Sequence, residues 1–321
     1  MEKKIGISVV VPVMNEEDNI QPFYDALMEV LPTLDTSYEI IYIDDGSTDS
    51  SLHLLHELEN KHKHIRVYAF RRNLGKSDAL MYGFMQAKGD LIYTLDADLQ
   101  DRPSEMPKLL AKVKDEGAEV VTGWKKDRKD KSYMVFISHF FNGMVNRMFN
   151  MHIHDYNCGF KLYTSEAAKS LRLYGGLYRF IPLLAAKAGF KVAEVPVEHA
   201  PRLRGKSKYG FSKLWKNIPD MFTMLFLVKF EKRPLHFFGV IGGAFLLIGC
   251  IMLGYLSIIH FMGESIGRRP LLIFGMLFMV SGFQIFFTGF LADLMIHISE
   301  ENTMLTIERK QYPIKYVSKK G

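Results

Sequence analysis

The chain has 321 residues, enough for one α/β domain of ordinary size and a further segment. Its formal net charge of +6 suits an anionic membrane surface or a nucleic acid, but no nucleic-acid-binding motif accompanies the charge, so nucleic acid is not an expected partner. The two cysteines, Cys158 and Cys250, indicate neither a disulfide nor a metal cluster and fit a reducing compartment.

Short apolar runs that end in polar clusters alternate with helical patterns in the N-terminal part of the chain. The predicted strands cover residues 7–12, 39–43 and 65–70, and a fourth strand carries Asp96 and Asp98. We expect residues 15–18 to cap a helix after the first strand, and a second helix near residues 51–58. This alternation predicts a mostly parallel α/β sheet, whose ligands bind beyond the carboxyl ends of its strands.

The fourth run ends in Asp96-Ala97-Asp98, which places two carboxylates two residues apart. On an extended segment such side chains share a face. Two hard oxygen ligands suit Mg²⁺ or Mn²⁺, which protein carboxylates hold while substrate phosphates complete the coordination. The pattern therefore predicts a metal and diphosphate site, although an Asp-x-Asp taken alone also fits a turn that caps a helix.

Membrane-directed patterns fill the rest of the chain. Residues 131–150 and 211–229 are amphipathic stretches with basic flanks, which favour helices at a membrane interface, although each alone also fits a core-facing helix. Residues 234–263 and 270–292 contain no Asp, Glu, Lys or Arg, and each stretch exceeds the roughly 20 residues that span a bilayer. We predict two transmembrane helices here, with Gly239 and Gly243 allowing close helix approach.

These patterns divide the chain into four parts: an α/β domain over residues 1–210, interfacial helices over 211–233, a transmembrane hairpin over 234–298 and a cytoplasmic tail over 299–321. No signal-peptide pattern begins the sequence, so the α/β domain and both termini are expected on the cytoplasmic side of the cell membrane. Arg268 and Arg269 in the outer loop oppose the positive-inside trend, so charge alone argues weakly for this orientation. The transmembrane helices also offer a surface for homo-oligomer formation.

The motifs VVVPVMNEEDNI, IIYIDDGSTDSS, RRNLGKSDAL, LDADLQDRP and DYNCGFK together resemble the family 2 inverting glycosyltransferases of the GT-A fold. More narrowly, the chain resembles the branch that holds dolichyl-phosphate mannose synthases and bacterial polyisoprenyl-phosphate glycosyltransferases. The motifs span residues 7–209 in the family's order and spacing. The resemblance implies a Rossmann-like GT-A catalytic domain that moves a sugar from a nucleotide donor to a polyprenyl phosphate.

The resemblance also implies roles for individual residues. The implied donor-binding residues are Pro12, Glu16, Asp44, Lys76 and Asp96, and the implied ligands of Mg²⁺ or Mn²⁺ are Asp96, Asp98 and Gln100. Asp44 would accept a hydrogen bond from the uracil imide of a UDP-sugar. From the residues alone, Asp45 fits either a base contact or a turn, Glu16 also fits a first-turn helix acid, and Lys76 also fits a solvated loop.

Asp155 of DYNCGFK is the implied catalytic base, beside Asp98 as the second catalytic residue. A phosphate monoester has a second pKa near ~6 and is mostly a dianion at neutral pH, so removal of a proton contributes little. Asp155 therefore acts either as a base or as a residue that positions the sugar or the acceptor, and the sequence leaves both roles open.

The stretch from His199 to Tyr209 resembles the family's R-x-x-G-x-S-K-Y segment, which implies an acceptor-phosphate site. Its implied ligands are Arg202, Arg204 and Lys208, and the same cations also fit a polybasic patch against anionic lipid. Ser138 matches a further acceptor-side serine of the family. One turn before it, Met134 stands where the family usually has a basic residue.

The expected reaction is transfer of glucose or N-acetylglucosamine from a UDP-sugar to undecaprenyl phosphate, for cell-envelope glycosylation. One alternative is a processive polysaccharide synthase, but the chain has no Q-x-x-R-W motif and too few spans. The other alternative is an inactive membrane scaffold, which would have lost acidic residues that are all present here, namely Asp44, Asp96, Asp98 and Asp155.

Overall fold

The computed structural model describes residues 5–126, 151–198, 200, 233–267, 269–307 and 312–318, together with Gly143, Asn146, Arg147, Phe226 and Phe230. The chain divides into two compact units. The first holds Met1–Asp220 and Tyr312–Gly321, and the second holds Met221–Gln311. The first unit contains the predicted α/β domain and the second contains the predicted membrane hairpin.

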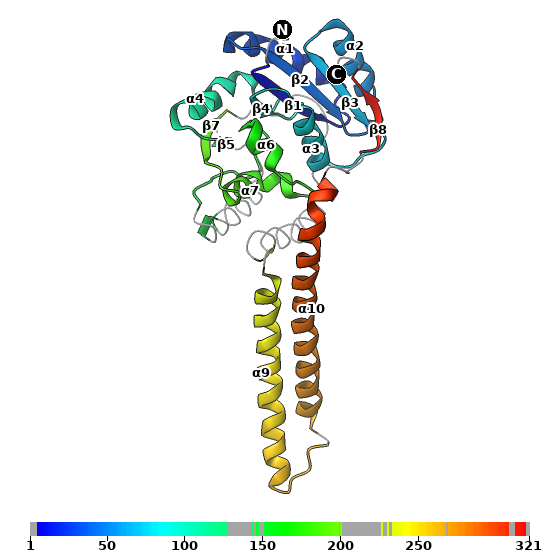
Figure 1. Cartoon of the computed structure of the whole chain (residues 1–321), viewed down its shortest axis with the longest axis vertical. Coiled ribbons are helices and arrows are strands. Elements are labelled where there is room, and N and C mark those ends of the chain that lie inside the picture. The colour runs from blue at the N-terminus through cyan, green and yellow to red at the C-terminus, as the bar shows by residue number, and fades with distance from the viewer. Residues whose placement is uncertain are drawn as a thin grey trace. The chain divides into compact units, whose positions relative to one another are not determined.

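An eight-stranded mixed sheet forms the centre of the first unit, in the order β7-β5-β6-β4-β1-β2-β3-β8 (Figure 1). Its strands are β1 (Ile7–Val13), β2 (Tyr38–Asp44), β3 (Ile65–Phe70), β4 (Leu91–Thr94), β5 (Val120–Lys125), β6 (Lys161–Thr164), β7 (Val192–Val197) and β8 (Ile314–Val317). Strands β4, β1, β2 and β3 run parallel, as do β5 and β7. Strand β6 is antiparallel to both β4 and β5, so the sheet is mostly parallel, as predicted.

Helices pack on the sheet and bury its apolar side chains. They are α1 (Ile20–Val30), α2 (Ser51–Lys61), α3 (Lys76–Gln86), α4 (Met106–Glu116), α6 (Ser165–Ser170) and α7 (Ile181–Lys187), with short 3₁₀ turns at η1 (Leu31–Leu34), η2 (Pro103–Glu105) and η3 (Leu177–Phe180). Fully buried residues such as Val9, Tyr42 and Phe23 show that the core lies between strands and helices. This packing fixes the strand ends that carry the polar motifs.

Two local predictions were wrong in their boundaries. The N-cap position of α1 is Asn19 rather than a residue within 15–18, and Asn19 makes no side-chain capping bond; the Asn15 side chain instead accepts a hydrogen bond from the Thr48 amide at 2.8 Å. Strand β4 ends at Thr94, so Asp96 and Asp98 lie in the loop that follows the strand. Since that loop turns sharply, with φ of 59° at Leu99, strand alternation does not explain where the two carboxylates point.

The sheet ends at β8, which comes from the last residues of the chain and pairs antiparallel with β3 (Figure 1). The hydroxyl groups of Tyr316 and Ser318 both donate to the buried carboxylate of Glu59 on α2, the first at 2.7 Å. The segment predicted as a tail over residues 299–321 is therefore divided between the two units. Its first part continues a long helix of the second unit, and its last part completes the sheet.

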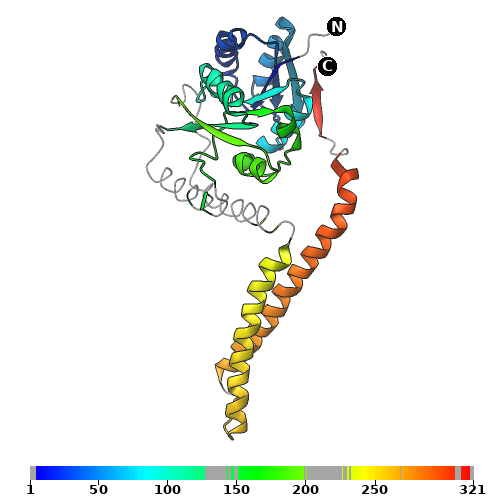
Figure 2. The same cartoon turned by 60° about the vertical axis from the view of Figure 1, so that its left-hand side comes forward.

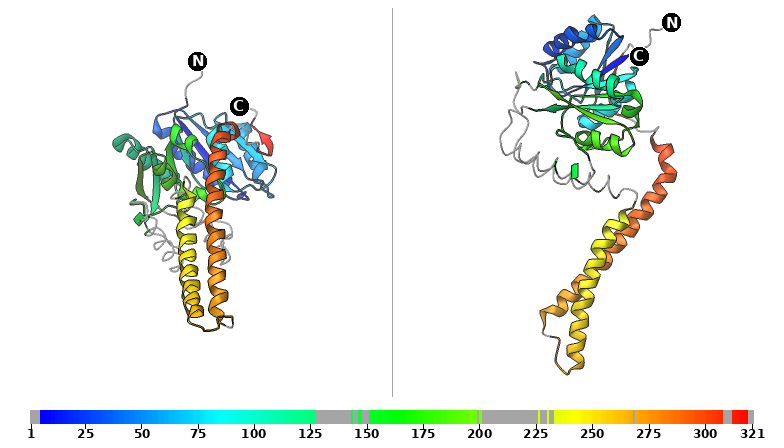
Figure 3. Two further views of the ribbon diagram at one scale, coloured as in Figure 1. Left: turned by 60° about the horizontal axis from the view of Figure 1, so that its bottom comes forward. Right: turned by 90° about the vertical axis from the view of Figure 1, so that its left-hand side faces the viewer.

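The second unit is a hairpin of two long helices, α9 (Pro234–Phe261) and α10 (Pro270–Ile307), which lie side by side in every view (Figures 2 and 3). By length and composition both are able to cross a bilayer: Pro234–Phe261 has 28 residues with mean hydropathy 2.3, and Pro270–Ile296 has 27 residues with mean hydropathy 2.0. Most of the large apolar side chains of the hairpin point outward and are exposed. Two membrane-length helices thus follow the sheet domain, as predicted.

Glycines seven residues apart allow the two helices to touch, but they are not the predicted pair. The contact glycines are Gly242 and Gly249 on α9 and Gly275, Gly282 and Gly289 on α10. A Cβ atom built on Gly282 would lie 2.7 Å from the backbone nitrogen of Leu246. At Gly243 such an atom meets nothing within 4 Å, and at Gly239 the nearest atoms are 3.9 Å away. The prediction of Gly239 and Gly243 as the contact pair was wrong, because both lie off the seam.

Candidate active site

The loops that follow β1 and β2 hold each other at the carboxyl end of the sheet. The Asn15 amide donates to Ser47 Oγ at 2.9 Å, and the Glu16 amide donates to Ser51 Oγ at 2.9 Å. Asp44 is buried at the end of β2 and accepts from the Ser47 amide at 3.2 Å. Burial raises the pKa of the Asp44 carboxyl above its ordinary value, although the hydrogen bonds from Ser47 act in the opposite direction.

Asp45 supports the backbone of the neighbouring loop. Its two carboxylate oxygens accept from the amides of Leu74 at 2.7 Å and of Gly75 at 2.9 Å. Gly75 has φ of 99°, a conformation that only glycine adopts without strain, and it directly precedes α3. Of the two readings of Asp45 that the sequence left open, these contacts favour a loop-holding role, one that places Lys76 at the start of α3.

Lys76 forms an ion pair with Asp96 and lies over the ring of Tyr178, with its Nζ atom 5.3 Å from the ring centre. Burial alone would raise the pKa of the Asp96 carboxyl, but the ammonium groups of Lys76, Lys125 and Lys161 outweigh it and lower that pKa. The same pairing raises the pKa of Lys76, against the opposing effect of burial. Both groups are therefore charged at neutral pH.

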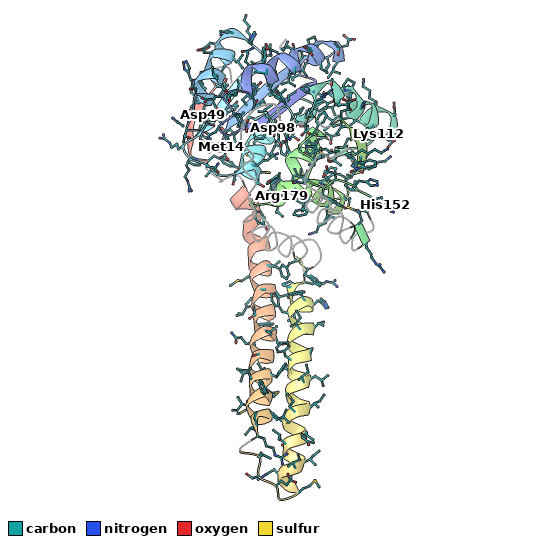
Figure 4. All side chains as sticks on the ribbon, turned by 180° about the vertical axis from the view of Figure 1, so that it is seen from behind. Met14, Asp49, Asp98, Lys112, His152 and Arg179 are labelled. Atoms are coloured by element: carbon teal, nitrogen blue, oxygen red, sulfur yellow. The ribbon has the colours of Figure 1, made fainter. Side chains whose placement is uncertain are left out.

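The loop after β4 presents the acidic pair and is held on both sides (Figure 4 labels Asp98). Asp98 is 8% exposed, and its Oδ1 atom accepts from the Gln100 amide at 3.2 Å. Asp101, at the end of the loop, pairs with Lys125 of β5 at 2.8 Å. On the other side Gly159 lies against the loop, and a Cβ atom there would lie 2.6 Å from Asp96 Oδ2, so a larger residue would displace that carboxylate.

The donor set of this loop fits a hard divalent cation. Asp96 and Asp98 supply carboxylate oxygens, Gln100 supplies an amide oxygen two residues further on, and Asp96 is kept ionised by its lysine neighbours. Within the described residues no group of three or more His, Cys, Asp or Glu side chains is arranged to hold a metal. The protein thus offers the one or two carboxylates that Mg²⁺ typically takes from a protein when substrate phosphates complete its shell.

The DYNCGFK motif folds beside this loop. Asp155 is 2% exposed, and its Oδ1 atom accepts from the Asn157 amide at 3.1 Å. Asn146 ties the motif down, since its Oδ1 atom accepts from the Tyr156 hydroxyl at 2.7 Å. Lys161 closes the motif by donating to the carbonyl of Cys158. Burial lowers the pKa of Lys161 to about 8 and raises the pKa of the Cys158 thiol to about 12.

Several predicted residues do meet at one edge of the sheet. Asp44 is the last residue of β2, and Lys76 is the first residue of α3. The loop after β4 carries Asp96, Asp98 and Gln100. Pro12 lies on β1 opposite Ile43. Glu16 accepts from the Asn19 side chain at 2.7 Å, before the first turn of α1. The predicted acceptor residues Ser138, Arg202, Arg204 and Lys208 lie outside the described residues, as do most of the two amphipathic stretches.

Sequence reasoning missed three residues near Asp96. Lys125 and Lys161 come from β5 and β6, and Tyr178 comes from η3. Only Lys161 belongs to a recognised motif, and nothing in the spacing of the other two points to this loop. They reach it because β6 inserts antiparallel between β4 and β5, which brings later parts of the chain to the same edge.

A mostly parallel sheet with an acidic loop at the carboxyl end of a central strand is the architecture of GT-A glycosyltransferases. The model of the family described as glycosyl transferase family 2 matches residues 8–172, which is half of the chain. The chain therefore belongs to glycosyl transferase family 2. This confirms the family predicted from the motifs.

Full-length relatives and solved structures agree with this membership. A dodecaprenyl-phosphate galacturonate synthase of Rhizobium johnstonii is 32% identical over 91% of this chain and 88% of that protein. An undecaprenyl-phosphate 4-deoxy-4-formamido-L-arabinose transferase of Klebsiella pneumoniae is 34% identical over 89% of this chain and 87% of that protein. Glucosyl-3-phosphoglycerate synthase of Mycobacterium tuberculosis, solved with Mn²⁺, UDP and glucosyl-3-phosphoglycerate, has a TM-score of 0.56 at 21% identity, covering 70% of this chain and 80% of that chain. The structural match confirms the GT-A fold.

Proposed function

We propose that this protein transfers a sugar from a nucleotide sugar to a polyprenyl phosphate at the cytoplasmic face of a membrane. The main support is that Lys76 pairs with Asp96 of the acidic loop, which gathers the cation and carboxylates that a metal-bound diphosphate would need, in a chain that also carries two membrane-length helices. The names of its full-length relatives support the same acceptor, since both are transferases or synthases of polyprenyl-phosphate sugars. Both termini lie on the cytoplasmic side in this proposal.

The residues of the site divide the work of the reaction. Asp44 binds the nucleobase, and Lys76, held beside Asp96, binds the diphosphate of the donor. Asp96, Asp98 and Gln100 would hold Mg²⁺ or Mn²⁺, which would supply positive charge against the departing diphosphate. Asp155 orients the sugar and the acceptor, and in-line attack by the acceptor phosphate inverts an α-linked donor to a β-linked product.

The donor sugar is proposed as glucose or N-acetylglucosamine, carried by UDP. The two relatives are named for a uronic acid and a formamido-pentose, so both of these sugar classes belong in the test. The acceptor ligands proposed are Ser138 with Arg202, Arg204 and Lys208, which supply a hydroxyl group and cations for a phosphate. Homo-oligomer formation through α9 and α10 remains part of the proposal.

The test offers radiolabelled nucleotide sugars one at a time to the purified full-length protein with undecaprenyl phosphate, and counts label in the lipid phase. We expect one sugar to give a lipid product that depends on a divalent cation and is absent with Asp98→Ala. Label in a long water-soluble polymer would support a processive synthase instead. If the protein binds UDP but yields no product from any sugar, the transferase proposal is wrong.

A further inference from the structure

Glu194 of β7 holds the backbone on which Asp155 stands. Its Oε1 atom accepts from the amide of His154 at 3.0 Å and from the amide of Asp155 at 2.9 Å. Its Oε2 atom also accepts from the His154 amide, at 3.0 Å, and contacts His154 Nδ1 at 2.7 Å. One carboxylate thus binds two successive backbone amides and the ring between them.

The His154 ring is fixed on its other side by Trp124 of β5. The two rings stack with centres 4.1 Å apart and planes inclined by 16°. Strands β5 and β7 are parallel neighbours, with Thr122 opposite Glu194 and Trp124 opposite Pro196. The loop before Asp155 is therefore attached to two adjacent strands of the sheet.

These contacts are unlike an ordinary surface ion pair. The side chain of Glu194 is only 8% exposed, so its charge has lost most of its water and is compensated by the amides that it binds. Hydrogen bonds from backbone amides to a buried carboxylate are strong and directional. They therefore fix the positions of the two amides relative to the Glu194 carboxylate. An alanine side chain would leave both amides without this acceptor, whereas glutamine would keep one oxygen acceptor but lose the negative charge and the second oxygen.

The position of Asp155 matters because the next residues of its motif form the wall of the acidic loop. Gly159 lies against Asp96, and Thr94 Oγ1 donates to the Gly159 carbonyl at 3.0 Å. The motif is thus held at Gly159 by the β4 end and at Asp155 by β7. A shift at either point would change the distance between the Asp155 carboxylate and the diphosphate site.

We propose that Glu194 is a positioning residue for sugar transfer, which acts by fixing the Asp155 backbone relative to the Asp96–Asp98 loop. The inference rests on the proposed function, and in particular on the role of Asp155 in it. Glu194 touches no reacting atom in this view. It sets the geometry of the residue that does, in the way that a buried acid commonly orients a catalytic side chain.

The experiment compares Glu194→Gln and Glu194→Ala with Glu198→Gln, in the full-length protein. Glu198 is a matched control, because it lies just beyond the same strand but is 65% exposed and pairs with Arg102. Misplacement of a reacting group by about 1 Å costs about 100-fold in rate, so we expect kcat to fall about 100-fold in Glu194→Ala and about tenfold in Glu194→Gln. The Kd for UDP should stay near the parent value in both variants, the melting temperature should stay near the parent value in Glu194→Gln, and Glu198→Gln should resemble the parent.

A double-mutant cycle with Asp155→Asn decides whether Glu194 acts through Asp155. If it does, adding Glu194→Gln to Asp155→Asn lowers kcat no further. Equal losses in the two backgrounds, or a parent-like kcat in Glu194→Ala, would overturn the inference, as would a parallel loss of UDP affinity and melting temperature. Parent-like activity of Asp155→Asn would also reject it, because the residue to be positioned would be unnecessary. Absence of lipid product from the parent protein would instead reject the proposed function.

Discussion

The Nζ atom of Lys76 and the Oδ1 atom of Asp96 form an ion pair that joins the first residue of α3 to the loop after β4. The pair places a positive charge beside the carboxylate that we assign to the divalent cation. Burial raises the pKa of the Asp96 carboxyl, but the neighbouring lysines lower it by more, so the net shift is downward. Removing Lys76 takes away part of the lowering effect and must shift that pKa upward.

Lys76→Met is therefore expected to weaken Mn²⁺ binding in the presence of UDP most strongly at acidic pH. In the parent, Asp96 stays ionised well below neutral pH because its pKa is lowered. In the Lys76→Met variant the Asp96 carboxyl is protonated at a higher pH than in the parent. As the pH is lowered, the variant should therefore lose Mn²⁺ affinity earlier than the parent does. Calorimetric titration at a series of pH values measures the effect, with Lys76→Arg as the control that keeps the charge. An unchanged pH dependence in Lys76→Met would contradict the pairing.

Asp98→Ala should abolish sugar transfer and Mn²⁺-dependent UDP binding. The diphosphate would lose both its anchor and a stabilising charge, which typically contributes several kcal/mol in such sites. Asp115→Ala is the matched control, because Asp115 is an exposed acid on α4. Turnover near the parent rate, or full activity in excess chelator, would refute the assignment of Asp98.

The pH profile of Asp155→Asn separates a base from a positioning residue. A base is most needed near pH 6, where the acceptor monoanion is abundant. If Asp155 is a base, the activity lost in Asp155→Asn should therefore recover at higher pH, where the acceptor ionises without help. A positioning residue is needed equally at every pH. We expect the ratio of variant to parent kcat to stay nearly constant between pH 6 and 8. A ratio that climbs steeply over this range would identify Asp155 as a base.

The glycine contacts of the hairpin predict opposite effects for two alanine substitutions. Gly282→Ala should destabilise the hairpin, since its Cβ would press on the backbone of α9, and such overpacking costs about 1–3 kcal/mol. Gly243→Ala should be neutral or stabilising by up to about 1 kcal/mol, because the site is open and alanine favours the helix. Thermal unfolding in detergent, followed by circular dichroism, compares the two variants. Equal behaviour would argue against the observed helix contact.

Truncation after Gln311 should destabilise the catalytic unit although both long helices remain. The deletion removes β8, exposes the edge of β3, and takes away the hydroxyl groups that Glu59 accepts from. We expect a lower melting temperature and a greater tendency to aggregate through the exposed edge strand. Tyr316→Phe, which removes one hydroxyl group and keeps the strand, serves as the milder comparison. If the truncated protein melts like the parent, β8 is dispensable for the domain.

The sequence predicted the parts of the fold whose signals are local. Strands β1 to β3 are continuous apolar runs bounded by turn residues, so their existence and order could be foreseen. The acidic residues Asp44, Asp96 and Asp98 follow such runs, which was enough to place them at one sheet edge.

Features that depend on distant partners could not be foreseen. The four residues of β8 form too short a pattern to predict a strand, and their partner β3 lies far away in sequence. Gly239 and Gly243 have the usual spacing of a helix contact, but the face that meets α10 is decided by the whole seam. Glu194 lies in a strand with no acidic motif, and its contacts appear only once β7 lies beside the His154–Asp155 loop.

The late position of β8 in the chain sets an order for the synthesis and folding of this protein. Both long helices are synthesised before residues 314–317, so the edge of β3 stays without this partner until those residues are made. Until then the Glu59 carboxylate lacks the hydrogen bonds that the hydroxyl groups of Tyr316 and Ser318 donate to it. Completion of the sheet therefore depends on a strand that is synthesised after both long helices, and a nascent chain stalled in α10 would still have an unpaired β3 edge.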